Sequence, residues 1–171
     1  MFNKYLKLVI AALIAVWAGF QFYDENIGNG IMILLLAGIF VFFFYKNEFL
    51  LLAFFQIRKQ NMAGAEKWLA YIKNPETALR KPQEAYYYFL QGLMVTQTSM
   101  TKAEKLFKKA LNIGLSMDHD KAMAKLNLAG VSMHKRRKRE ATLLLNEAKK
   151  LDKQGMLKDQ IKMMKDQMKK M

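Results

Sequence analysis

The sequence of 171 residues contains no cysteine, two histidines and two prolines. Without cysteine the chain has no disulfide framework, no thiolate metal site and no cysteine nucleophile. The two histidines lack metal-site spacing, and no glycine-rich loop is present that could cradle a phosphate. Asp118, His119 and Asp120 are interpreted as a polar linker, because three consecutive side chains cannot easily point at one ion. We therefore predict no catalytic, cofactor-binding or metal-binding residues, no small-molecule substrate and no enzymatic activity.

Acidic residues are also scarce, with 14 against 28 basic ones, which gives a net charge of +14. Residues 1–45 contribute nothing to this excess, because Lys4 and Lys7 are balanced by Asp24 and Glu25. The whole excess lies in residues 46–171. A positive field of this size favours anionic neighbours such as lipid head groups, RNA or an acidic protein surface. The alternative is a solvated face that keeps the protein away from its neighbours.

Charge is almost absent from two apolar runs of nineteen residues each, Tyr5–Tyr23 and Ile27–Tyr45. Each run is long enough to cross a bilayer as a helix. We predict a two-helix transmembrane hairpin over residues 1–45, with spans at about 5–23 and 27–45. Two alternatives remain open: residues 1–18 form a cleaved signal peptide, or both runs are buried in a water-soluble core.

The basic residues around these runs predict their orientation. The connecting segment 24–30 has no lysine or arginine, whereas the outer flanks carry Lys4, Lys7, Lys46, Arg58 and Lys59. Because basic flanks stay on the cytoplasmic side, both ends are expected there and the loop outside. The sequence thus predicts an integral, multi-pass protein of the plasma membrane with its remaining part in the cytoplasm.

Residues 46–152 are internally repetitive at an interval of 38 residues. Three segments, which begin at Asn61, Ser99 and Arg137, align with small or apolar residues at helical spacing. Their matching positions are Ala65, Ala103 and Ala141; Leu69, Phe107 and Leu145; and Ile72, Ala110 and Ala148. A second helical pattern precedes each segment, with matching positions Phe49, Tyr87 and Lys125; Leu52, Leu90 and Leu128; and Ala53, Gln91 and Ala129. Each unit is thus a helix, a short turn and a helix.

These positions resemble the tetratricopeptide repeat, a 34-residue pattern of helix, turn and helix. Unit two matches it with Tyr87, Leu90, Ala103, Phe107 and Ala110, and unit three with Leu128, Ala129, Ala141, Leu145 and Ala148. The chain departs from the family in its longer period, in Gln91 and Ile72 at small positions, and in Lys125 at the aromatic position. The resemblance implies an all-α protein with an α-solenoid of three units, 46–83, 84–121 and 122–152. The alternative is an ordinary helical bundle.

The joint between the two parts lacks glycine and proline from Ile39 to Gln60. We predict one unbroken helix over Tyr45–Gln56, with Lys46 at the level of the head groups, that fixes the direction of the repeats. The first helix of unit one also carries more apolar residues than one stripe needs: Leu50, Leu51, Phe54 and Phe55. These pack on another helix, rest on the membrane interface or bind a partner. Ala122 is expected outside the packing positions.

Two candidate surfaces follow from the repeat alignment. First helices line the inner groove of such arrays, so the predicted partner-binding residues are Tyr88, Gly92, Val95, Leu126, Asn127, Gly130 and Met133. A basic patch on the turn of unit three, made of Lys135, Arg136, Arg137, Lys138 and Arg139, would contact an acidic protein or RNA through non-specific phosphate contacts. Its alternative is a solvated turn.

The tail 153–171 has an apolar stripe of Met156, Leu157, Ile161, Met164 and Met168 opposite lysines. It predicts a capping helix on unit three, or otherwise an adaptable methionine-rich binding face or a basic helix on anionic lipid.

The favoured function is a membrane-anchored adaptor that holds a protein partner at the cytoplasmic face, either as a scaffold or as an accessory subunit of a membrane complex. The alternative is a membrane-bound basic module that contacts RNA or the ribosome.

Overall fold

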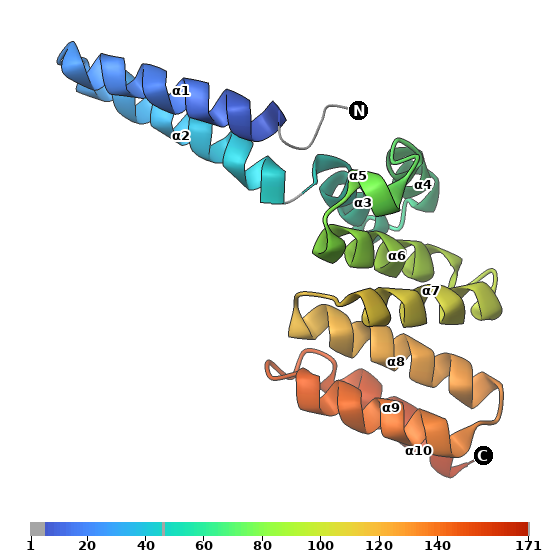
Figure 1. Cartoon of the computed structure of the whole chain (residues 1–171). Coiled ribbons are helices and arrows are strands. Elements are labelled where there is room, and N and C mark those ends of the chain that lie inside the picture. Colours follow the sequence, from blue (N-terminus) through green and yellow to red (C-terminus); the bar gives the residue numbers. More distant parts are fainter. Residues whose placement is uncertain (1–5, 46, 171) are drawn as a thin grey trace. The chain divides into compact units, whose positions relative to one another are not determined.

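The computed structural model describes residues 6–45 and 47–170, and all regular secondary structure in these ranges is helical (Figure 1). The predicted all-α class is therefore confirmed. Tyr5, the predicted start of the first span, and Lys46, the predicted marker of the head-group level, lie outside the described residues. The chain divides into two compact units, Met1–Leu79 and Arg80–Met171.

In the first unit, α1 (Leu6–Tyr23) and α2 (Ile27–Tyr45) pack along each other as a hairpin (Figure 1). The turn closes through Glu25, whose backbone is left-handed at φ 61°, and through a bond of 2.9 Å from the Asn26 N–H to the Gln21 carbonyl. The buried side chains of the hairpin are small, namely Ala11, Ala18 and Ala37. The large apolar side chains are consequently left exposed, among them Leu13, Val16, Phe20, Leu34, Leu35 and Phe42.

The predicted continuous helix from Tyr45 to Gln56 is wrong, because the helical path is broken at Asn47. This residue has an extended backbone, φ −65° and ψ 127°, and it caps α3 (Glu48–Arg58). Its Oδ1 accepts hydrogen bonds from the N–H groups of Phe49 at 3.0 Å and Leu50 at 3.4 Å. Asparagine favours this position since its short side chain satisfies backbone donors that a starting helix leaves free. The sequence signal was Asn47 followed by the acidic Glu48 in the first turn.

Helix α3 packs against α4 (Met62–Ala70), and a short helix α5 (Pro75–Ala78) follows. Their common core is small and apolar, with Leu50, Ala53, Ala65, Leu69 and Ile72 buried. Asn61 caps α4 by accepting a hydrogen bond of 2.9 Å from the N–H of Gly64. Beside this core, the rings of Phe49, Trp68 and Tyr71 pack on one another.

The second unit consists of two helical pairs and a final helix (Figure 1). Helices α6 (Lys81–Val95) and α7 (Met100–Ile113) form the first pair, and α8 (Asp118–His134) and α9 (Lys138–Leu151) form the second. The pairs join through contacts of α7 with α8. Phe89 and Phe107 are the largest fully buried side chains, and their ring centroids lie 6.1 Å apart between α6 and α7.

Helix α10 (Lys158–Lys169) packs on α9 and α8. Leu157 at its N-terminal end, Ile161 and Met168 are buried in one core with residues of both helices. Met156 remains 66 % exposed. Most of the predicted apolar stripe of the tail is therefore used for packing within the chain.

The 38-residue alignment predicts burial well for the second helices and less well for the first. All nine aligned positions of the second segments are buried, although Ile72 lies two residues beyond the end of α4: Ala65, Leu69, Ile72, Ala103, Phe107, Ala110, Ala141, Leu145 and Ala148. In the first helices Leu90 and Leu128 are buried, but Leu52 is 38 % exposed. Ala122 was predicted outside the packing positions, and this is wrong. It is fully buried in the core that α8 shares with α9 and α10.

Two turns that the alignment makes equivalent also have the same backbone geometry. Gln60 after α3 and Arg136 after α8 lie two periods apart and are both left-handed, at φ 59° and 57°. In each turn the next residue donates its N–H to the carbonyl five residues earlier: Asn61 to Gln56 at 2.9 Å, and Arg137 to Ser132 at 2.8 Å. This is the Schellman geometry, which satisfies the last carbonyls of a helix.

Candidate functional site

The predicted groove residues are mostly buried between helices of the second unit. Tyr88, Gly92, Leu126 and Met133 are buried, and the last two belong to the core with α9 and α10. A Cβ placed on Gly92 would lie 2.7 Å from the ring of Phe107, so α6 and α7 touch there. These four residues stabilise the helical pairs rather than present an open surface.

The three remaining groove residues, Val95, Asn127 and Gly130, are half-buried. The Asn127 amide donates a hydrogen bond of 2.8 Å to the Met123 carbonyl, one turn earlier in α8. The space above Gly130 is bordered by the Met164 methyl group, which would lie 3.5 Å from a Cβ at this position. Helix α10 therefore borders the predicted groove at this end. Partner binding in the groove remains a prediction, now limited to a smaller set of accessible side chains.

Tyr88 is covered by a cation from the neighbouring helix. The Lys109 ammonium lies 4.0 Å from the Tyr88 ring centroid and donates a hydrogen bond of 2.8 Å to the Tyr88 hydroxyl. An ammonium over an aromatic face is attracted by the negative face of the ring. The contact ties α6 to α7 and places a positive charge beside Tyr88, one of the predicted groove residues.

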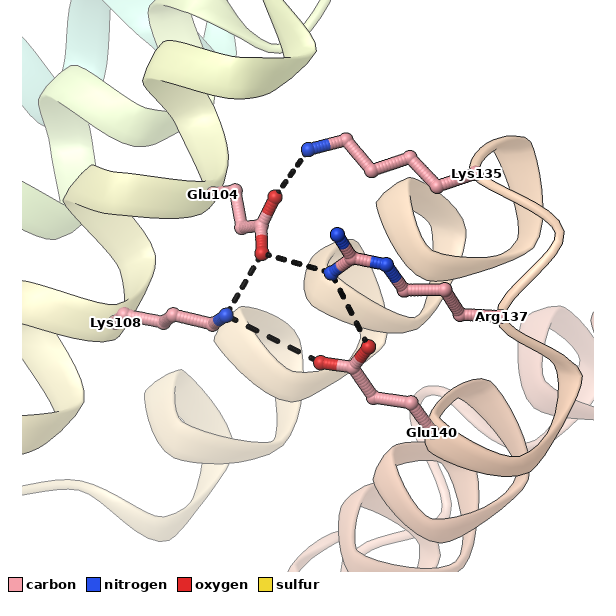
Figure 2. Close-up of polar contacts among 5 residues, drawn as sticks. All are labelled: Glu104, Lys108, Lys135, Arg137 and Glu140. Carbon is pink, nitrogen blue, oxygen red and sulfur yellow. Dashed lines mark hydrogen bonds and ion pairs between the residues drawn. The ribbon is translucent and has the colours of Figure 1, made fainter.

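The basic patch lies where predicted, on the turn between α8 and α9, but its cations are not equivalent. Figure 2 shows that Lys135 and Arg137 both reach the carboxylate of Glu104 on α7. The Lys135 ammonium lies 2.5 Å from Glu104 Oε2, and the Arg137 guanidinium lies 3.6 Å from Oε1. Lys108 of α7 and Glu140 of α9 complete a ring of alternating charges. The turn is thereby fastened to the preceding helical pair.

Glu104 is the centre of this cluster, and its side chain is only 13 % exposed. Hydrogen bonds from Lys108 and Lys135 favour the charged form of the carboxyl and lower its pKa from 4.5 to about 2. Glu104 therefore stays ionised at any physiological pH and holds two cations of the patch in a structural role. This residue was not predicted from the sequence. Its signal was the spacing to Lys108, an i, i+4 pair of opposite charge on one helix face.

The cations that remain available are Arg136, Lys138 and Arg139. All three are exposed and make no ion pair with any residue of the ranges 6–45 and 47–170. Arg136 projects from the left-handed residue of the turn. Three exposed cations on four consecutive residues can attract an acidic surface or a nucleic-acid backbone, and such contacts weaken as salt rises.

The candidate membrane helix is the apolar stretch Ile27–Phe44 of α2. Among the described residues it alone is long and apolar enough to cross a membrane, and only 11 % of it is buried. Such low burial is unlike the core helix of a water-soluble protein, whose apolar faces are covered. The apolar stretch of α1, Leu8–Tyr23, is shorter. The second predicted span is thus supported by length and composition, and the two-span hairpin remains a prediction.

Asp118 and Asp120, which flank His119, have partners other than a metal. Asp118 pairs with Lys153 at 2.7 Å and with Lys121 at 3.4 Å, and these contacts lower the pKa of the Asp118 carboxyl. Asp120 is buried near Tyr86, and burial raises the pKa of the Tyr86 hydroxyl, with a further contribution from the Asp120 charge. Within residues 6–45 and 47–170, no three histidine, aspartate or glutamate side chains are grouped in a way that could hold a metal ion.

Comparisons with protein-family models, with curated proteins and with solved structures found no match. A function for this chain therefore rests on its own residues. The features that bear on it are the exposed apolar helix, the paired helices with their aligned positions, and the three available cations of the basic turn.

Proposed function

We propose that this protein is a membrane-anchored helical-repeat adaptor that holds a protein partner at the cytoplasmic face of the membrane. The observation that carries the proposal is the apolar stretch Ile27–Phe44, which is long enough to span and largely exposed. Exposure of its uncovered apolar side chains to water would be unfavourable in free energy. Full transfer of one leucine, isoleucine or phenylalanine out of water contributes about 1.5–3 kcal/mol. Five such residues, Leu34, Leu35, Leu36, Ile39 and Phe42, are 45–62 % exposed, so together they favour a lipid environment by several kcal/mol.

The adaptor role is supported by the helical pairs. Paired helices whose aligned positions recur at a fixed interval build extended surfaces that bind other proteins, as in tetratricopeptide-like arrays. In this chain the second-helix positions of all three units are buried, and the turns after α3 and α8 share one geometry. We propose that residues 46–152 form such an array, with α10 as its cap.

The partner would contact the array through its accessible polar and charged groups. Val95 and Asn127 are the half-buried groove residues with side chains, and Arg136, Lys138 and Arg139 are the available cations of the turn. A partner with an acidic segment fits this arrangement and fits the +14 net charge of the chain. Anionic lipid or RNA is the alternative ligand of the same cations.

The test is site-specific photo-crosslinking in membranes isolated from cells that express the protein. A photo-reactive residue at Val95 or Asn127 is expected to capture a membrane or membrane-associated protein, and one at the exposed Lys105 on α7 serves as the control. Capture at the first two positions that survives a high-salt wash before irradiation supports the adaptor. Equal capture at all three positions, or none at any, contradicts it.

The RNA alternative is tested by co-purification with the same membrane-embedded protein. Substitution of Arg136, Lys138 and Arg139 by glutamine removes the three available cations and leaves the Glu104 pairs intact. If RNA or ribosomes co-purify with the membrane-embedded protein, and this variant together with moderate salt abolishes the association, the basic module replaces the adaptor as the favoured function.

A further inference from the structure

Helix α3 has an apolar surface on the side that does not pack on α4. Leu50 and Ala53 are buried toward the core, whereas Leu52 and Phe55 are 38 % and 48 % exposed. Leu52 and Phe55 are three residues apart and therefore lie on one face of the helix, with the half-buried Leu51 beside them. The burial pattern thus separates two apolar faces on one short helix, of which only one is covered.

Aromatic residues with polar tips lie next to this face. The ring of Phe49, one turn before Leu52, stacks on Tyr71 with centroids 5.5 Å apart and on Trp68 at 6.3 Å. Tyr71 is 53 % exposed. Tyrosine and tryptophan gather at membrane–water interfaces, since the body of each ring is apolar and one end forms hydrogen bonds.

Basic side chains border the same region. Arg58 and Lys59 are exposed at the end of α3, and the Arg58 guanidinium lies 5.9 Å from the Phe54 ring centroid. Lys67 and Lys73 line one surface pocket together with Tyr71. An apolar face bordered by long basic side chains suits the boundary between acyl chains and anionic head groups, because the stems stay apolar while the charges reach outward.

The chain itself keeps α3 close to the end of the apolar stretch. Helix α2 ends at Tyr45 and α3 begins at Glu48, three residues later. Three residues extend over at most about 11 Å. If α2 spans the bilayer, this length places the start of α3 in or at the edge of the head-group layer, which adds roughly 5–8 Å on each side of the hydrocarbon core. The break at Asn47 allows α3 to leave the direction of α2.

We propose that α3 is an interfacial helix, whose face of Leu51, Leu52 and Phe55 contacts the lipids of the cytoplasmic leaflet. The occupant of this apolar face is the bilayer that holds α2, and Arg58 and Lys59 lie toward its head groups. The inference rests on the membrane insertion proposed above. In this arrangement the membrane covers the exposed side of the pair formed by α3 and α4.

The test uses the absence of cysteine to place one fluorophore at a time on the full chain. An environment-sensitive dye is attached after Leu52→Cys, and the protein is reconstituted into vesicles of phosphatidylcholine and phosphatidylglycerol. Some vesicles carry a spin-label quencher high on the acyl chain, and others carry it near the bilayer centre. Leu35→Cys on α2 and Leu143→Cys on α9 are the matched sites, because both leucines are exposed, by 62 % and 57 %.

At position 52 we expect a blue-shifted emission and a larger loss of intensity with the shallow quencher than with the deep one. Position 35 should lose more intensity with the deep quencher, and position 143 should respond to aqueous iodide instead. Phe55→Cys must reproduce the result of Leu52→Cys. This second variant guards against a local defect at one site.

Two failures are distinguishable. If position 35 is quenched by lipid and position 52 is not, the interfacial helix is refuted while the anchor stands; protection of position 52 from iodide in that case indicates a second copy or another protein segment on α3. If position 35 is not quenched either, the proposed anchor fails, and the inference fails with it. Equal lipid quenching at positions 52 and 143 also overturns it, since the contact would not be specific to α3.

Discussion

Gly92 and Gly130 lie 38 residues apart and share one position of the sequence alignment, yet the structure predicts opposite effects of the same substitution. A Cβ on Gly92 would lie 2.7, 2.9 and 3.0 Å from three ring atoms of Phe107. Ordinary carbon contacts are about 3.5–4.0 Å. Phe107 is fully buried and cannot move away into solvent. A Cβ on Gly130 meets only the Met164 methyl group at 3.5 Å, the far end of a flexible side chain.

The magnitudes follow from two effects. Alanine in place of glycine inside a helix stabilises by about 0.5–1 kcal/mol, and this gain is common to both sites. Overpacking of a well-filled core costs about 1–3 kcal/mol, and only Gly92→Ala incurs it. We expect Gly130→Ala to raise the free energy of unfolding by about 0.5–1 kcal/mol. We expect Gly92→Ala to lower it, so that the two variants differ by about 1–3 kcal/mol.

The assay is native-state hydrogen exchange of the full chain in detergent micelles, with the protection of amides in α6–α9 as the measure of local stability. This readout reports the stability of the second unit separately from that of the apolar hairpin, which depends on the detergent. A stabilising effect of Gly92→Ala, or equal effects at both positions, would refute the close approach of α6 and α7 and with it the packing of the pair.

Three further predictions concern single side chains. Because the folded-state pKa of Glu104 is lowered to about 2 from 4.5, its pairs stabilise the protein above about pH 4.5, and this contribution is lost as the pH falls toward 2. Relative to Glu104→Gln, wild-type protein should be more stable by about 1–2 kcal/mol near neutral pH, after allowance for screening of the exposed cations, and equal to it at pH 2 in urea titrations. Arg136→Gly should stabilise by up to about 1 kcal/mol, because glycine accepts the left-handed backbone without strain, whereas Arg136→Ala, which also removes the charge, should bring no gain. Asn47→Ala should lower the stability of α3 by about 1 kcal/mol through loss of its cap, and Asn47→Asp should retain it, as measured by exchange of the first α3 amides.

Sequence patterns predicted the helices and much of their packing because both depend on local spacing. The 38-residue interval identified the buried positions of the second helices, since each needs a small or apolar residue where it meets its pair. The 38-residue interval could not predict that Leu52 is exposed while Leu90 is buried, because it assigns both leucines the same position. Whether such a leucine is covered depends on what packs outside its own helical pair.

Other features depended on long-range contacts or on one decisive residue. Ala122 lies between the aligned positions, and it is buried in the core to which α10 contributes. Glu104 contacts Lys135 across 31 residues of sequence. The sequence therefore suggested a basic patch of five available cations, whereas two of them, Lys135 and Arg137, pair with Glu104. The break at Asn47 was predictable in principle from its capping side chain, but the uninterrupted apolar pattern on both sides concealed it.

The central claim is a membrane-anchored chain whose helical pairs lie in the cytoplasm, and its most direct test is cysteine labelling on intact cells. The exposed Asn29, at the start of α2, and the exposed Gln154, after α9, each take a single cysteine without background from native thiols. We predict that an impermeant thiol reagent labels Asn29→Cys in intact cells and labels Gln154→Cys only after the cells are permeabilised. Labelling of Gln154→Cys in intact cells, with Asn29→Cys protected, would contradict the claim.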